Sequence, residues 1–110
     1  MNLEKWQSQI RKGTLEFIIL LVLRKGEFYG YELIRKIRET LDMETSEGTI
    51  YPILTRLKKA DLVTSRWEHQ ETGMPRKYYQ ITPHGSQTVE EMQTEWELFS
   101  GSINKLLESK

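Results

Sequence analysis

Seven apolar residues follow one another without a break from Phe17 to Leu23, and this run limits how the chain can fold. Periodicity cannot separate a strand from a helix in such a run. We expect a helix over residues 14–25, because Thr14 is a suitable N-cap and Gly26 suits the position after a helix end. A helix that is apolar on every side must be covered on every side. Since 110 residues build one small core, we expect a second copy of the chain to supply part of that cover.

The remaining pattern predicts further helices. Apolar residues recur at helical spacing in residues 3–10, so a short N-terminal helix is expected before an interruption at Gly13. Residues 28–31 are expected to form a turn and residues 31–41 an amphipathic helix. A third helix is expected over residues 46–60, because Ser46 is a good N-cap.

Two strands and a final helix complete the pattern. Alternating residues predict strands over residues 63–69 and 76–82, joined by a loop that contains Gly73. Thr82-Pro83 suits the start of a helix. The helix that follows would extend about 37 Å at 1.5 Å per residue, too long to fold back onto a small core.

Element order and charge indicate a reading domain joined to an assembly element. The order predicts a mainly α fold with a small β-hairpin: a winged helix-turn-helix DNA-binding domain over residues 1–82 and a long C-terminal dimerisation helix over residues 83–110. Net charge is zero, but residues 46–80 carry six basic and four acidic side chains, whereas residues 81–110 carry two and five. An ordinary mixed surface explains this asymmetry equally well.

Composition argues against several other classes. The absence of cysteine excludes a disulfide framework and thiolate metal sites and fits a reducing compartment. With two histidines, no phosphate loop and no nucleophile motif, we expect no metal, no cofactor and no catalytic site. The first residues do not form a signal peptide, and the apolar run is too short to cross a bilayer. A cytoplasmic protein that is not an enzyme and contacts no membrane is expected.

The third helix and the hairpin carry the pattern expected of a DNA reader. No acidic residue lies between Gly48 and Ala60, and a duplex groove favours cations, donors and small residues over carboxylates. Pro52 either produces a kink that suits the packing or provides a rigid surface against DNA. A solvated basic helix face and a solvated hairpin are the alternatives. The candidate DNA-binding residues are Ser46, Gly48, Thr49, Tyr51, Pro52, Thr55, Arg56, Lys59, Arg66, Arg76 and Lys77.

The last helix has a seam of apolar residues at alternating spacings of three and four, which is typical of a helix–helix interface. We expect it to pack against its symmetry mate and the mate's first helix, although it could instead cover its own domain. The candidate dimer residues are Leu15, Ile19, Val89, Met92, Trp96, Phe99, Ile103 and Leu106. Trp96 and Phe99 either fill the interface or form a slot for a planar aromatic effector.

Five segments in order resemble the PadR family of bacterial regulators. They are Gly13-Thr14-Leu15, Tyr29-Gly30-Tyr31-Glu32-Leu33, Gly48-Thr49-Ile50-Tyr51-Pro52-Ile53-Leu54 with Arg56-Leu57, Arg76-Lys77-Tyr78-Tyr79, and Ile81-Thr82-Pro83-His84-Gly85. The single long C-terminal helix resembles the short-tailed subfamily.

The resemblance implies a homodimeric repressor that binds double-stranded operator DNA through its third helix and wing. It adds Tyr29 and Tyr31 to the candidate DNA-binding residues. It also implies release by a small-molecule effector in some members, with Trp96 as the aromatic residue of a pocket at the dimer centre. A winged-helix protein-interaction module that does not bind DNA is the alternative function.

Overall fold

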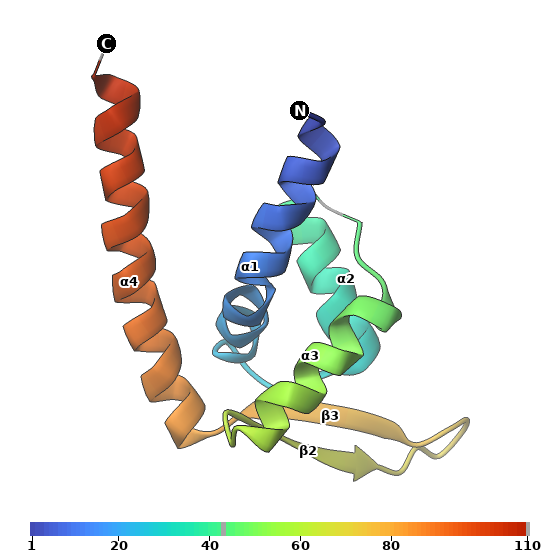
Figure 1. The fold of residues 1–110 in the computed structure, drawn as a ribbon. Helices are drawn as coiled ribbons and strands as arrows, with labels where there is room; N and C mark the ends of the chain where they lie inside the picture. The colour runs from blue at the N-terminus through green and yellow to red at the C-terminus, as the bar shows by residue number, and fades with distance from the viewer. Residues whose placement is uncertain (43, 110) are drawn as a thin grey trace.

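The computed structural model describes residues 1–42 and 44–109, so Met43 and the last residue of the expected dimerisation helix, Lys110, lie outside it. Within these ranges the chain is mainly helical with a small antiparallel sheet, as the sequence predicts (Figure 1). The elements are α1 (Leu3–Leu23), β1 (Phe28–Tyr29), α2 (Gly30–Leu41), α3 (Glu47–Lys59), β2 (Val63–Glu68), β3 (Arg76–Ile81) and α4 (Pro83–Glu108).

Helix α1 is one continuous helix, so the expected interruption at Gly13 is wrong. The helix begins after Asn2, whose side-chain oxygen accepts a hydrogen bond from the Glu4 amide at 2.8 Å. Thr14 does not cap a new helix; its hydroxyl donates to the Ile10 carbonyl at 2.8 Å. A glycine inside a helix costs only about 1 kcal/mol relative to alanine, which the flanking helical residues offset.

The sheet has three strands in the order β1-β3-β2, all antiparallel. Phe28 and Tyr29 pair with Tyr79 and Tyr78, so the expected turn at residues 28–31 contains a two-residue strand, and α2 begins at Gly30. Aromatic residues fit a pleated, half-buried surface, which explains why the two-residue strand β1 pairs with β3. The expected hairpin of β2 and β3 is present, and its register runs from Val63–Ile81 to Glu68–Arg76.

The C-terminal half of α1 lies at the centre of the core. It packs against α2, α3, β3 and α4, and Ile19 and Leu20 are fully buried. The chain itself therefore covers much of the apolar run that was expected to need a second copy. Leu15, Ile19 and Val89, which were candidate dimer residues, are 3%, 0% and 0% exposed, because they are buried in the core of this chain.

Helix α4 leaves the core soon after it begins. Figure 1 shows α1 and α4 diverging as they leave the core, so that the later turns of α4 stand apart from the other elements. Trp96, Phe99, Ile103 and Leu106 are all exposed beyond the buried Val89. No helix within residues 1–42 and 44–109 is long and apolar enough to span a membrane.

Candidate nucleic-acid interface

Helix α3 presents the expected division between a buried and an exposed face. Ile50, Ile53, Leu54 and Leu57 are buried in the core. The opposite face is exposed; it comprises Gly48, Thr49, Pro52, Thr55 and Lys59. The core therefore fixes α3 through its apolar side and leaves an outer surface without carboxylates after Glu47.

Pro52 lies inside α3 without breaking the helix, which continues from Glu47 to Lys59. Its ring is on the exposed face. Ser46 is the N-cap residue as expected, but its side chain makes no capping hydrogen bond; its hydroxyl lies 3.2 Å from that of Thr49. The first turn of α3 therefore keeps backbone N–H groups without a side-chain acceptor.

Tyr51 joins α3 to the start of α2. A Cβ atom added to Gly30 would lie 2.4 Å from the Tyr51 hydroxyl oxygen, so only glycine allows this ring to approach. Burial raises the pKa of Tyr51, and the nearby Glu47 carboxylate raises it further. This contact explains why a glycine stands between the candidate residues Tyr29 and Tyr31.

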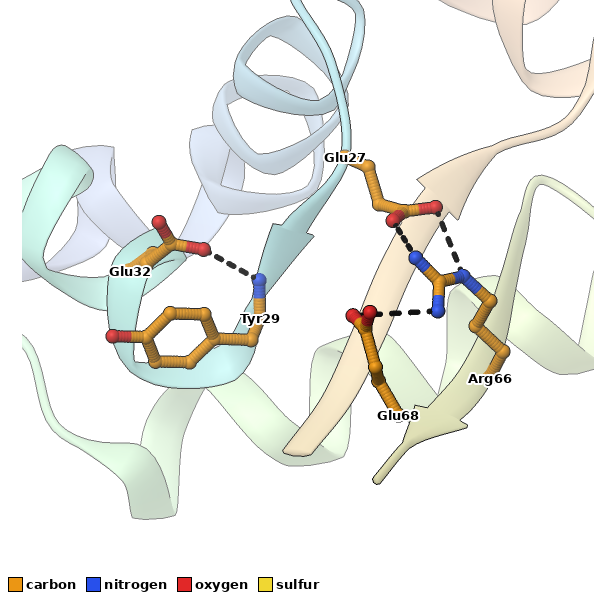
Figure 2. Close-up of polar contacts among 5 residues, drawn as sticks. All are labelled: Glu27, Tyr29, Glu32, Arg66 and Glu68. Carbon is orange, nitrogen blue, oxygen red and sulfur yellow. Dashed lines mark hydrogen bonds and ion pairs between the residues drawn. The ribbon is translucent and has the colours of Figure 1, made fainter. Parts of the chain in front are cut away.

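Two of the candidate arginines are held by carboxylates of other elements. The Arg56 Nη2 atom lies 2.9 Å from Glu16 Oε1 on α1. Figure 2 shows Arg66 on β2 between Glu27, to which it donates two hydrogen bonds, and Glu68, whose Oε2 lies 3.5 Å from Nη1. The hydrogen bond with Glu27 is the main reason that the pKa of Arg66 is raised. These pairs partly neutralise the two cations.

The sheet places Tyr29 beside the cations of the hairpin. The Arg76 guanidinium lies 4.4 Å from the centre of the Tyr29 ring, and the Tyr29 and Tyr78 rings meet edge to face at 5.7 Å. Arg66 lies 5.0 Å from the centre of the Tyr78 ring. The Tyr29 backbone N–H donates to the Glu32 carboxylate at 3.0 Å, which fixes the first turn of α2 (Figure 2). Tyr31 is exposed, 5.9 Å from the Arg35 guanidinium.

Lys77 belongs to a cluster that sequence reasoning recognised only in part. Its Nζ atom lies 5.6 Å from the centre of the exposed Trp67 ring and 5.9 Å from that of Tyr79. Burial lowers the pKa of Lys77, and the Lys58 ammonium lowers it further. Lys58 and Trp67 were not among the candidates. The sequence did contain a signal for each of them: Lys58 is a cation beside the outer face of α3, and Trp67 is a large aromatic residue on a short strand.

A second feature is an apolar groove of about 930 Å³ between α1 and α4. Trp96 and Phe99, the candidate effector residues, line it together with the seam residues Met92 and Ile103. Trp96 lies 6.2 Å from Phe17, centre to centre. The sequence-based list missed the α1 wall, formed by Trp6, Ile10 and Phe17. The helical spacing of Trp6 and Ile10 was the available signal.

Residues 1–42 and 44–109 contain no group of His, Asp and Glu side chains arranged to hold a metal ion.

Comparison with known families identifies the fold. The Transcriptional regulator PadR-like family matches residues 19–91, well over half of the chain. The chain belongs to this family. PadR-like proteins regulate transcription and are not enzymes, and the resemblance drawn from the sequence is confirmed.

Solved PadR-like structures share the fold closely, which confirms the winged helix-turn-helix class. A PadR-like transcriptional regulator of Bacillus cereus is 38% identical, with a TM-score of 0.84 over 93% of this chain and 99% of that chain. The Bacillus subtilis protein named Negative transcriptional regulator PadR is 33% identical over 78 residues, 69% of this chain and 43% of that protein. The structure of Bacillus subtilis PadR in complex with operator DNA has a TM-score of 0.67 at 32% identity, over 73% of this chain and 46% of that chain.

Proposed function

We propose that this PadR-like chain binds operator DNA through α3 and the β2–β3 hairpin. The outer face of α3 is the observation that carries the proposal. It is exposed, has no carboxylate from Gly48 to Ala60, and combines small residues with Lys59. Such a surface suits close approach to phosphates and base edges. The relative from Bacillus subtilis that was solved with operator DNA supports the same use of the fold.

The proposed DNA surface consists of the candidate DNA-binding residues, but these residues do not contribute equally to its positive charge. Lys59, Arg76 and Lys77 carry most of the cationic character, because Arg56 and Arg66 share theirs with Glu16, Glu27 and Glu68. Tyr29 enters through its contact with Arg76. We expect the hairpin cations to contact phosphates rather than base edges, since Arg76 and Lys77 are positioned against aromatic rings.

The same proposal includes a homodimer joined by residues 83–110. The groove between α1 and α4 leaves Trp96, Phe99 and Ile103 exposed in a single chain. Large exposed apolar patches mark interaction sites. An α4 helix from a second copy offers the apolar seam that would cover this groove. A two-fold dimer would also present two α3 helices to successive turns of the duplex.

A repressor role and release by an effector complete the proposal. The repressor role follows from the family resemblance, and the Bacillus subtilis relative is named a negative regulator. Trp96 and Phe17 supply aromatic walls for a planar compound in the groove. Titration with a planar aromatic compound should quench the emission of Trp96. Because Trp6 also lines the groove, the control is Trp6→Phe/Trp96→Phe, in which only Trp67 still reports; equal quenching in this double variant would contradict this site.

The DNA-binding proposal is tested by comparing Lys59→Ala with Lys105→Ala on a labelled mixed-sequence duplex. Each removes one exposed lysine, but only Lys59 lies on α3. Each phosphate contact contributes about 0.9 to the slope of log K against log salt. Lys59→Ala should weaken binding and flatten the slope, while Lys105→Ala should leave both unchanged. Equal effects of the two substitutions would contradict the proposal that α3 contacts DNA. In a separate experiment, selection from a random duplex library should yield a palindromic site.

A protein-interaction module remains the competing function, and the ion pairs of Arg56 and Arg66 favour it. Both cations are already satisfied within the chain, and net charge is zero. This alternative predicts no salt-dependent affinity for any duplex, so the same titration separates the two functions.

A further inference from the structure

A second cavity lies away from the groove, where α1, the end of α2 and the first turn of α3 meet. Its volume is about 370 Å³. Helix α1 contributes one wall, and the segment that leads into α3 contributes the other. The lining residues are Ser8, Arg11, Lys12, Leu15, Arg38, Glu44, Thr45, Ser46 and Thr49. Only Ser46 and Thr49 were among the candidate DNA-binding residues.

The lining of this cavity is cationic. Arg11 and Lys12 come from α1 and Arg38 from α2, against one carboxylate, that of Glu44. Three cations converging on a small cavity favour an anionic ligand, and guanidinium groups match the oxygens of a phosphate especially well.

The N-terminus of α3 adds uncharged donors to the same cavity. Ser46 and Thr49 of the first turn line it, and the Ser46 side chain caps no backbone N–H. Helix α3 is 13 residues long, so its aligned peptide dipoles and free N–H groups favour an anion at this end.

Thr45 provides an independent sign of a missing ligand. The residue lines the cavity, is only 8% exposed, and its hydroxyl has no hydrogen-bond partner among residues 1–42 and 44–109. A buried hydroxyl left without a partner is unfavourable by about 1–3 kcal/mol. The backbone around it is held in place, because Arg38 donates to the Thr45 carbonyl oxygen from Nε at 2.8 Å and from Nη2 at 2.6 Å.

We propose that this cavity binds a phosphate group. Arg11 and Lys12 supply charge, the first turn of α3 supplies N–H donors, and the Thr45 hydroxyl completes the donor set. The phosphate comes either from the DNA backbone or from a free phosphate compound. The first source rests on the proposed function and would extend the DNA surface from α3 onto α1; the second does not depend on it.

Titration of the 110-residue chain with inorganic phosphate tests the site directly. Backbone amide NMR signals of residues 46–49 should shift saturably with phosphate and not with chloride at equal ionic strength. In the double variant Arg11→Gln/Lys12→Gln, the phosphate Kd should rise about tenfold, as expected from the loss of charge-assisted hydrogen bonds. The matched double variant Lys5→Gln/Lys105→Gln removes the same charge outside the cavity and should keep the native Kd.

Thr45→Val separates a ligand hydroxyl from a merely structural one, because it keeps the side-chain shape. It should weaken phosphate binding several-fold. The proposal is overturned if phosphate shifts none of the amides of residues 46–49. It is equally overturned if Arg11→Gln/Lys12→Gln and Thr45→Val both bind phosphate with the native Kd.

A DNA titration then identifies the source of the phosphate. If the source is the DNA backbone, Arg11→Gln/Lys12→Gln should reduce the salt slope for the mixed-sequence duplex by about 0.9 per site occupied. A native slope together with impaired phosphate binding would assign the site to a free phosphate compound. If the native chain binds no duplex at all, the proposed function fails while the phosphate titration still decides the site.

Discussion

At the scale of single residues, Gly85 is the position where α3, the sheet and α4 meet. The Thr82 hydroxyl donates to the Asp61 carbonyl at 2.7 Å and accepts from the Gly85 N–H at 2.9 Å. The Thr82 N–H donates to the Leu62 carbonyl at 3.1 Å. These bonds draw the start of α4 against the turn after α3, so that the Leu62 backbone lies directly over Gly85.

Gly85→Ala should therefore destabilise the fold. The added Cβ would lie 2.1 Å from the Leu62 carbonyl oxygen and 2.7 Å from Ile81 Cγ1, so backbone atoms must move. Overpacking of this kind lowers the free energy of unfolding by about 1–3 kcal/mol. Gly101→Ala is the matched control in the same helix, because nothing lies within 4 Å of its added Cβ. It should raise stability by about 0.5–1 kcal/mol. Denaturant unfolding that ranks the two variants the other way would contradict the packing at Gly85.

Tyr51 gives the fold a dependence on alkaline pH. Burial, and then Glu47, raises its pKa above the ordinary value, so the folded state favours the protonated phenol. The resulting stabilisation is fully present below about pH 10 and is lost as pH rises through the folded pKa. Tyr51→Phe should therefore lose less stability than the native chain as pH rises above about 10. Glu47→Gln should give an intermediate loss, and identical denaturant curves for all three would exclude this contribution.

At the scale of elements, an ion pair spans the sheet from the residue before the short strand β1 to β2. Glu27 precedes β1 and pairs with Arg66 on β2, on either side of β3 (Figure 2). Glu27→Gln should loosen Arg66 and leave its charge free for DNA. The salt slope for duplex binding should then increase by up to about 0.9 per chain. Glu90→Gln on α4 removes the same charge at a distance, so equal changes in both variants would assign the effect to net charge alone.

The elements show what a sequence pattern can and cannot predict. The periodicity of α3 predicted its buried face, because each of its apolar positions meets the same core. The pattern was misleading at Gly13, where the flanking helical residues offset the cost of one glycine, and at residues 28–31, where a partner strand distant in sequence decides the outcome. β1 exists because Tyr78 and Tyr79 of β3 pair with it, and no local signal contains that pairing.

At the scale of the whole molecule, the candidate site was predictable in composition but not in charge balance. The sequence located Arg56 and Arg66 on the expected helix and strand. Their partners, Glu16 and Glu27, are 40 and 39 residues away along the chain, so only the fold brings them together. Similarly, the spacing of apolar residues predicted the seam of α4, but it did not predict that only the start of this seam is buried in the core. Val89 belongs to the core, whereas Met92, Trp96, Phe99 and Ile103 line the groove.

The division of α4 into a buried start and an exposed remainder leads to a sharp test of the dimer. Phe99 and Leu98 are neighbours on the exposed part, at 62% and 64% exposure, but only Phe99 lines the groove. A carboxylate placed in a covered apolar groove would be desolvated without a partner, whereas one on the open side of the helix would stay in water. Phe99→Asp should therefore be monomeric by light scattering and lose duplex binding, while Leu98→Asp should remain dimeric and bind. Because neither residue is in the core, circular dichroism should show both variants folded. A dimer that persists in Phe99→Asp, or dissociates equally in Leu98→Asp, would show that this groove is not where two copies meet.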